Sequence, residues 1–416
     1  MRSTAALAIW VTVALGGVVV GGAITAHHPE FLLDAAPFAG RWHAVVRPQL
    51  AIAVAVGAGV ALVGPALAAT LRWRALLFVT AMASFTWAIA VATTVGWHGV
   101  TAPMYEHGGY LEGLRAIGSP GHFLRTFTAT WMRYPTHIKG HPPGFVLLLW
   151  LLDHVGLAGA TWSALLVVAV GASASAAVLL VARDVAGEPV ARAAAPFVVL
   201  APAAVWLATS ADALFAGVVA WAVVATVAAT RSRPWAIAAG LLWAGTLLLS
   251  YGLVLAAPIA VAVLVHRRRV DIAIIVGATA VAVLVAFGLG TGFWWPAGLA
   301  ATRRAYWAGV ASQRSAWVFV WWNVSALAFA LGPAIAPAFA RLRRNGVTLL
   351  VGSAVGALVV ADLTLLSKAE VERIWLPWVP WALLATACLP RAGRRTWLAA
   401  QAATGIGLQV ALRSPW

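Results

Sequence analysis

One acidic residue in a long polar stretch has the surroundings of a general base. Glu106 lies in "MYEHGGYLEG", shortly after an apolar run, and His107 follows it directly. A carboxylate at a water–lipid boundary, beside an imidazole, can take a proton from a hydroxyl group. Glu112 is a second candidate for this task. The alternative interpretation of Glu106 is a solvated loop carboxylate.

The same polar stretch ends in "YPTHIKGHPPG", which holds His137, Lys139 and His141. Two prolines after His141 fix the backbone and begin an apolar helix, because proline is tolerated in a first helical turn. His141 is therefore expected to stand rigidly at the mouth of the apolar region. A zinc site is not predicted, since the proline-rich turn spoils the helical spacing of the two histidines and no acidic third ligand is nearby.

A third candidate site lies in "LLSKAEVERIWLPW", where Lys368, Glu370, Glu372 and Arg373 crowd between two apolar runs. Charged groups at such a depth are costly and commonly face a cavity or a partner. Arg373 could hold a phosphate through two parallel hydrogen bonds, with Lys368 as a point charge and a glutamate to orient the arginine. An internal salt-bridge cluster that closes a tight loop is the alternative.

Two further groups of residues are open to more than one interpretation. Arg303 and Arg304 precede Tyr306 and Trp307. Arginine beside aromatic rings suits a sugar face with a phosphate, and it suits a lipid interface equally well. Asp212, in "ATSADALFAG", is either a helix cap or a side chain that points into the same cavity as the other candidates.

The composition predicts that a membrane-embedded bundle positions these residues. The 416 residues are 62% hydrophobic and 10% charged, and the mean hydropathy is +0.91, whereas a soluble domain carries about 25% charged residues. Lipid leaves the backbone only helices or closed barrels, and the alternating pattern of a barrel is absent. The chain is therefore expected to be an all-α polytopic membrane protein. The lone Cys388 leaves no disulfide framework.

The apolar runs predict about thirteen spans, with the N-terminus in the cytoplasm. The spans are placed at 5–26, 49–70, 75–96, 160–182, 190–208, 211–230, 234–250, 252–266, 270–290, 316–338, 346–366, 375–390 and 396–412. Every short inside loop then carries arginine, as the positive-inside rule requires. The net charge of +16 is therefore explained by the basic inside loops that set the membrane topology, and no nucleic-acid partner is expected.

The threading makes residues 1–416 one transmembrane domain with three outer loops. The loops are 97–159, 291–315 and 367–374, and the first is expected to be the catalytic loop. If the short apolar run at 144–156 crossed the membrane, every later loop would change sides and the basic clusters would lie outside. We therefore expect this run to be a juxtamembrane or re-entrant helix. Basic residues in these loops break the positive-inside trend, and binding of an anionic group is the natural reason for them.

The motifs together resemble those of GT-C-fold membrane glycosyltransferases. The likeness is greatest to the superfamily of protein mannosyltransferases and aminoarabinose transferases (glycosyltransferase family 39-like), in its actinobacterial type. In that superfamily an acidic motif and then a tyrosine follow an early membrane helix, and the first outer loop ends in His-Pro-Pro or Lys-Pro-Pro. Here "YEHGGYLEG", with Tyr110, and "GHPPGFVLLLW" are similar in type and order, and "KAEVERIWLPW" resembles a late segment. The likeness covers residues 75–390, although the usual aspartate is absent.

The resemblance implies a GT-C-like bundle of 11–13 helices that transfers a sugar, with mannose or arabinose expected, from a polyprenyl-phosphate donor. The acceptor would be a glycan, lipid or protein of the cell envelope, reached from the extracytoplasmic face of the plasma membrane. The residues implied to bind substrate are Tyr110, His137, Lys139, His141, Asp212, Arg303, Arg304, Lys368, Glu370, Glu372 and Arg373, with Glu106 and His107 in the catalytic role. No cofactor follows from the motifs, and a requirement for a divalent cation stays open.

Two alternatives remain beside this interpretation. If the first helix of the family corresponds to residues 5–26, Glu30 or Asp34 would be the base instead of Glu106. The rival function is a membrane transporter or flippase for a lipid-linked or anionic substrate. Intramembrane ionisable residues and an inverted repeat would favour it, but the charges gather in the outer loops and no convincing repeat is seen.

Overall fold

The computed structural model describes residues 2–105, 109–114, 117–208 and 210–415. Within these ranges nearly all regular structure is helical. The exceptions are the two-residue strands β1 (Arg41–Trp42) and β2 (Leu412–Arg413), which pair antiparallel with Arg41 opposite Arg413. The prediction of an all-α chain is therefore confirmed.

Seven helices in the described part of the chain are long and apolar enough to cross a membrane. At 1.5 Å per residue, each covers about 27 Å or more, close to the thickness of a hydrocarbon core. Each coincides with a span predicted from the sequence. They are α1 (Arg2–Thr25), α2 (Leu50–Thr70), α3 (Trp73–Ala92), α9 (Ala160–Ala186), α12 (Ala211–Ala229), α15 (Val270–Thr291) and α19 (Gly346–Leu363).

The other predicted spans are shorter, interrupted or, in the case of α22, long enough at 18 residues but less apolar. They correspond to α10 (Glu188–Val199) with α11 (Ala204–Leu207), α13 (Pro234–Leu249), η5 (Tyr251–Ala256) with α14 (Ala257–His266), α17 (Ala316–Leu331) with α18 (Ile335–Phe339), α21 (Val379–Ala382) with η7 (Leu383–Cys388), and α22 (Arg394–Ala411). At the break after α17, the buried Gln401 replaces lost helical hydrogen bonds. Its Nε2 donates to the Leu331 carbonyl at 2.8 Å, and its Oε1 accepts from the Ala334 N–H at 3.3 Å. Such breaks are tolerated where protein satisfies the freed backbone groups.

The predicted outer loops contain short helices. These are α4 (His98–Thr101), η3 (Ala102–Met104), α5 (Tyr110–Leu114), α6 (Pro120–Thr130), η4 (Trp131–Arg133), α7 (Thr136–Lys139), α8 (Gly144–His154), α16 (Trp295–Ala308), η6 (Val310–Ser312) and α20 (Val371–Ile374). Two further short helices lie elsewhere: η1 (Pro29–Phe31) follows α1, and η2 (Thr93–Val95) ends the span predicted at 75–96. With 11 residues, α8 is about 16 Å long and too short to cross a membrane.

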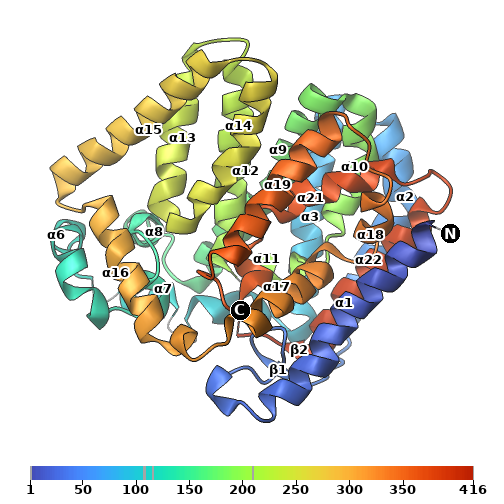
Figure 1. Cartoon of the computed structure of the whole chain (residues 1–416), viewed down its shortest axis with the longest axis horizontal. Coiled ribbons are helices and arrows are strands. Elements are labelled where there is room, and N and C mark those ends of the chain that lie inside the picture. Colours follow the sequence, from blue (N-terminus) through green and yellow to red (C-terminus); the bar gives the residue numbers. More distant parts are fainter. Residues whose placement is uncertain (1, 106–108, 115–116, 209, 416) are drawn as a thin grey trace.

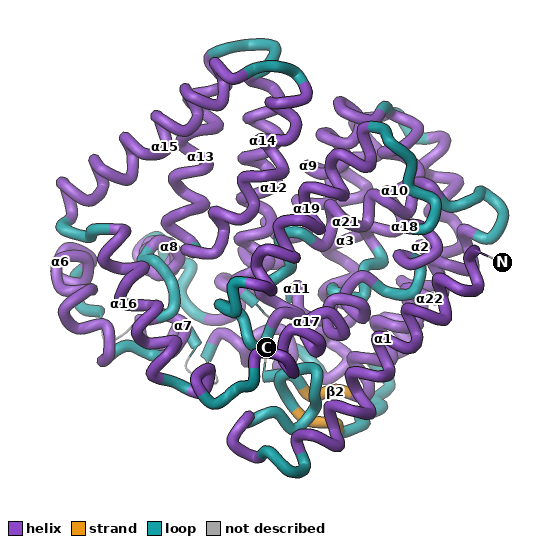
Figure 2. The backbone as a smooth tube through the Cα atoms, in the orientation of Figure 1, coloured by secondary structure: helices purple, strands orange, loops and turns teal. Residues whose placement is uncertain are grey.

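The long helices pack around α9 and α12, which contact each other along their lengths. Figure 1 shows α13, α14 and α15 on one side of this pair, and α2, α3, α10 and α22 on the other. The tube in Figure 2 shows how little strand the chain contains and how loops join the helices at their ends. The loop helices α6, α7, α8 and α16 gather beside the C-terminal end of α15.

Side-chain contacts group the loops at two ends of the bundle. At one end, Arg267 donates to Asp184 and to the Thr230 hydroxyl, and Arg192 donates to the Ala68 carbonyl at 2.7 Å. The loops held there are the ones predicted to be inside. The N-terminus of α12 lies at the other end, about 28 Å away along its 19 residues. That end carries the candidate site.

Candidate functional site

A buried ion pair joins the start of α12 to α20. Arg373 Nη1 donates to Asp212 Oδ2 at 2.7 Å, and the two side chains are 8% and 7% exposed. Ser210 prepares Asp212 for this pairing, because its hydroxyl caps α12 by accepting from the Asp212 N–H and donates to Oδ2 at 2.7 Å. Asp212 is therefore a residue of the first helical turn and the charged partner of Arg373, and it lines the pocket described below. The helix cap itself is Ser210, so the interpretation of Asp212 as the cap is wrong.

A second carboxylate also holds Arg373. Glu370 Oε2 accepts from Arg373 Nη2 at 2.5 Å, and the Glu370 side chain is 31% exposed. Burial alone lowers the pKa of the Arg373 guanidinium, but the charges of Glu370 and Asp212 outweigh it and raise that pKa above its usual value. Ala369 and Glu370 both have positive φ, 77° and 63°, which non-glycine residues seldom adopt. The turn that presents Glu370 to Arg373 is thus sharply bent.

His141 and Tyr110 lie beside this pair. The His141 Nδ1 is 2.9 Å from the His137 carbonyl, so Nδ1 carries the proton and Nε2 is free to accept when the ring is neutral. Burial lowers the pKa of His141, although Asp212 acts in the opposite direction. The Tyr110 ring contacts His141 with centroids 6.0 Å apart and stacks on His137 at 5.6 Å.

A small, partly open pocket of about 20 Å³ lies among these side chains. Tyr110 is 6% exposed, and its hydroxyl has no hydrogen-bond partner within the described structure. Burial raises the pKa of this hydroxyl well above its usual value, so it remains a neutral donor. A buried hydroxyl without a partner is costly, and a polar ligand would satisfy it. The pocket is lined by Pro103, Met104, Tyr110, His137, Ser210, Ala211, Asp212 and Arg373.

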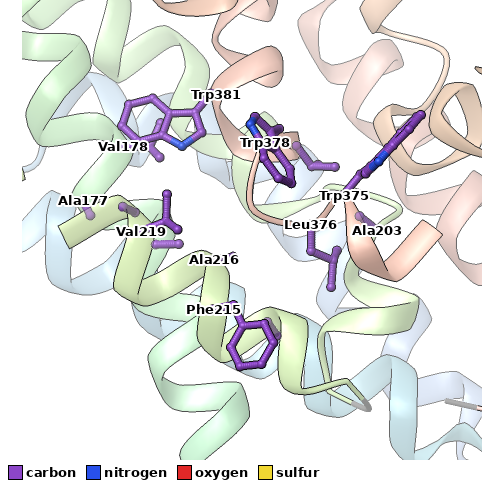
Figure 3. Packing of buried hydrophobic residues seen from close by; sticks show 14 of the residues in the cluster. Ala177, Val178, Ala203, Phe215, Ala216, Val219, Trp375, Leu376, Trp378 and Trp381 are labelled. Carbon is purple, nitrogen blue, oxygen red and sulfur yellow. The ribbon is translucent and has the colours of Figure 1, made fainter. Parts of the chain in front are cut away.

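Tryptophan packing fixes the segment that carries Arg373. Figure 3 shows Trp375, Trp378 and Trp381, which follow Arg373 closely; Trp381 lies beside Val178 of α9 and Val219 of α12, and Trp375 lies near Ala203. Trp381 is fully buried, and the Trp378 indole donates to the Leu255 carbonyl at 3.2 Å. Phe215 of α12 lies in the same region, and its ring centroid is 5.8 Å from that of His141. Close packing of this kind leaves the arginine little freedom.

Glu372 points away from Arg373 and toward the segment after α1. Its Oε1 accepts from the Ala39 N–H at 3.0 Å, while Oε2 is buried without a hydrogen-bond partner in the described residues. The side chain is 1% exposed, and burial raises its pKa to about 7. Glu372 therefore ties the loop between α1 and α2 to α20 and is not placed to orient Arg373.

Lys368 is used inside the protein, which differs from the expected role of a free phosphate ligand. Its Nζ donates to the carbonyls of Ala311 and Arg314, at 3.0 and 2.8 Å. Arg314, one of the basic outer-loop residues expected to bind an anionic group, in turn donates to the Lys368 carbonyl at 2.6 Å and to the Phe31 carbonyl at 3.1 Å. These reciprocal bonds brace the loop before α20. For Lys368 the interpretation as a structural cluster holds.

The remaining predicted site residues are distributed as follows. Glu106 and His107 lie outside the described residues, although Met104 and Tyr110 on either side of them in the sequence both line the pocket. Arg303 and Arg304 are exposed on α16, and Lys139 is half-buried with its carbonyl accepting from Thr302. The alternative bases Glu112, Glu30 and Asp34 are all exposed, and Glu30 pairs with His28 at 2.8 Å.

The sequence did not identify Ser210 as part of the site, although it stands two residues before Asp212 in a helix-capping position. A search of the described residues for three or more His, Cys, Asp or Glu side chains grouped to hold a metal ion finds none. Comparison with family models, with curated proteins and with solved structures finds no match to this chain.

Proposed function

We propose that the chain is a membrane glycosyltransferase that moves a sugar from a polyprenyl phosphate to a hydroxyl group of a cell-envelope acceptor. The observation that carries the proposal is the meeting of Asp212, Arg373 and His141 beside one pocket. Three segments far apart in the sequence supply them, at one end of a bundle of apolar helices. A lipid-linked phosphosugar needs both an apolar environment for its chain and polar groups at the edge of that environment.

In the proposed reaction, Glu106 takes the proton of the acceptor hydroxyl. The hydroxyl oxygen then bonds to the anomeric carbon as the bond from that carbon to the phosphate oxygen breaks. The polyprenyl phosphate leaves with the electron pair, and the configuration at the anomeric carbon inverts. General-base help of this kind typically contributes 10²- to 10⁴-fold in rate. Asp212 is a carboxylate that lines the pocket, so the test must distinguish Asp212 from Glu106 as the base.

Arg373 would bind the leaving phosphate, but its charge is already matched by two carboxylates. A phosphate must therefore displace one of them. Glu370 is the one expected to yield, since it is 31% exposed while Asp212 is 7% exposed. The exchange would leave Arg373 between Asp212 and a phosphate, as a preorganised cation at the site of developing charge. Tyr110 and the His141 Nε2 would then contact sugar hydroxyls.

The isoprenoid chain would occupy apolar surface on the side of the bundle. An open groove runs along α14 from Ala257 to His266, and Leu349 and Ser353 of α19 form its other wall. Four of its eight lining residues are alanine or valine, and only His266 and Ser353 have polar side chains. Such a surface suits an acyl or isoprenoid chain, because apolar contact is favourable and demands no polar partner.

The test is transfer from a synthetic polyprenyl-phosphate mannose or arabinose by the purified protein in liposomes, followed as release of polyprenyl phosphate. Glu106→Gln is expected to reduce release at least about 100-fold, and Asp153→Asn, a change to an exposed aspartate on α8, is the matched control. If Asp212→Asn abolishes release while Glu106→Gln does not, Asp212 is the base. Movement of intact donor between leaflets without release would contradict the proposal and indicate a transporter.

A further inference from the structure

Four arginines on the loop helices at the site end are exposed. They are Arg125 on α6, Arg133 in η4, and Arg303 and Arg304 on α16. None of the four makes a salt bridge in the part of the chain that the structure describes. The sequence explains why, because it has no Asp or Glu between Glu112 and Asp153 and none between Asp271 and Asp362. We call these four residues the arginine patch.

At the opposite end of the bundle, several arginines form salt bridges. There Asp184 pairs with Arg231 and Arg267, while Glu188 pairs with both Arg183 and Arg192. Asp271 likewise pairs with Arg233 and Arg269. Three carboxylates thus hold six arginines at that end. The arginine patch has no carboxylate partner in the described part of the chain, so its charge is open to an anion from outside the chain.

An aromatic cluster holds the patch in one place. Phe127 of α6 meets Phe293 edge to face with ring centroids 5.4 Å apart, and Phe123 contacts Tyr134 at 5.3 Å. The backbone of Gly292 lies so close to Arg125 that a Cβ there would be 3.1 Å from the arginine Cγ. The contacts dock α6 onto the residues directly after α15, and α16 packs against α6. Figure 1 shows α6 and α16 together at that end of α15.

The position of the patch along the membrane normal follows from α15. This helix has 22 residues, enough to cross the hydrocarbon core. Arg125 lies against Gly292, where the helix ends, and α16, which carries Arg303 and Arg304, leads from there to the end of α19, where Tyr306 donates to the Leu365 carbonyl. Side chains just beyond a span lie at the level of lipid headgroups. Exposed Trp294 and Trp307, at 49% and 41%, lie on the same segments, as is typical of a membrane interface. A set of unpaired arginines at that level faces phosphate groups.

We infer that the arginine patch is a binding surface for anionic phospholipid headgroups in the leaflet at the site end. Each guanidinium can form two parallel hydrogen bonds with a headgroup phosphate. The surface would anchor α6 and α16, and with them the loop that contains His137 and His141, at a fixed height relative to the lipid. This inference does not depend on the proposed sugar transfer.

The test is lipid selection by the full-length protein in native mass spectrometry, with equal amounts of phosphatidylglycerol and phosphatidylcholine in the micelles. The wild type is expected to retain phosphatidylglycerol preferentially. A variant with R125Q, R133Q, R303Q and R304Q should lose at least about tenfold of that preference, since each basic residue near a charged surface contributes to the attraction. The matched control is R343Q, R344Q, R391Q and R395Q, which removes four exposed arginines elsewhere in the chain.

Location and lipid specificity are read separately. A photoreactive phosphatidylglycerol should label peptides from 120–133 and 295–308 in the wild type, and this labelling should survive in the control variant. Equal labelling in the patch variant would overturn the inference. The inference would also be overturned if inorganic phosphate or a soluble polyphosphate blocked this photolabelling as effectively as unlabelled phosphatidylglycerol does. Either result would indicate a site for a free anion or a polymer.

Discussion

Arg373 and Asp212 are 161 residues apart in the sequence, yet the Arg373 Nη1 donates to Asp212 Oδ2 at 2.7 Å. The pair is buried and connects α20 to the first turn of α12. Removing one partner leaves the other charge buried without compensation, which costs about 3–5 kcal/mol. Arg373→Gln and Asp212→Asn should therefore each lower the thermal unfolding midpoint in detergent. Arg233→Gln, which breaks the more exposed pair with Asp271, should change stability by less than about 1 kcal/mol.

The second partner of Arg373 should behave differently. In the proposed reaction the half-buried Glu370 carboxylate competes with phosphate for Arg373, so we expect Glu370→Gln to bind polyprenyl phosphate more tightly. Asp212→Asn should not have this effect, because Asp212 is buried and is also held by the Ser210 hydroxyl. Isothermal titration with a short-chain polyprenyl phosphate checks this prediction. Weaker binding in Glu370→Gln would show that the carboxylate helps to hold the ligand instead of yielding to it.

Glu372 predicts a pH dependence of stability. Its folded pKa is about 7, raised by burial from an ordinary value of 4.5. The folded state therefore binds more protons between these values, and the stability that this gives is present below pH 4.5 and lost as pH rises through 7. The total change is roughly 3 kcal/mol at 1.36 kcal/mol per pKa unit.

The variant Glu372→Gln should remove this loss and be more stable than the wild type at pH 8. Its amide can still accept from the Ala39 N–H, so the link to the loop after α1 is preserved. Glu112→Gln, a change to an exposed residue, is the control and should leave the pH profile unchanged. The measurement is the unfolding midpoint from pH 4.5 to 8. An identical slope in wild type and Glu372→Gln would rule out Glu372 as its source.

His141 should affect the pH dependence of stability in the opposite direction to Glu372. Burial lowers its pKa below the ordinary value of 6.5, so the folded state binds fewer protons, and stability is lost as pH falls below 6.5. In the Glu372→Gln variant, the loss of stability at low pH should remain while the loss at high pH is removed. His141→Asn in that background should reduce the loss at low pH, because an asparagine amide can donate to the His137 carbonyl without titrating. His122→Asn, at an exposed histidine, is the control, and an unchanged acid limb in the His141 variant would contradict the assignment.

Gly144 ends the "HPPG" motif at a point of close contact. A Cβ there would lie 2.4 Å from the Leu248 carbonyl oxygen, so Gly144→Ala must push α8 away from α13. We expect a loss of stability of about 1–3 kcal/mol, the usual cost of overpacking. Gly245→Ala, within α13 and with nothing within 4 Å of the added Cβ, should be neutral or stabilising. The two unfolding midpoints decide between these outcomes.

The aromatic residues show where reasoning from the sequence stopped. Tryptophan is typical of the membrane interface, and Trp294 and Trp317 are indeed exposed. Trp206 and Trp381 are fully buried in the core. Residue type alone cannot separate these cases, because the exposure of a side chain depends on which helices pack against it.

The sequence by itself determined the all-α character of the chain and the places of its long apolar helices. Hydropathy depends only on neighbouring residues, so it can be read along the chain. It also identified Asp212, His141 and Arg373 as unusual polar residues in an apolar setting. Only the tertiary structure decided which charges meet. Arg373 finds Asp212 from a distance of 161 residues, and Lys368, five positions earlier, bonds to carbonyls of another loop. The sequence does not distinguish these two cations. The packing of the helices places Arg373 at the pocket and Lys368 in a structural contact.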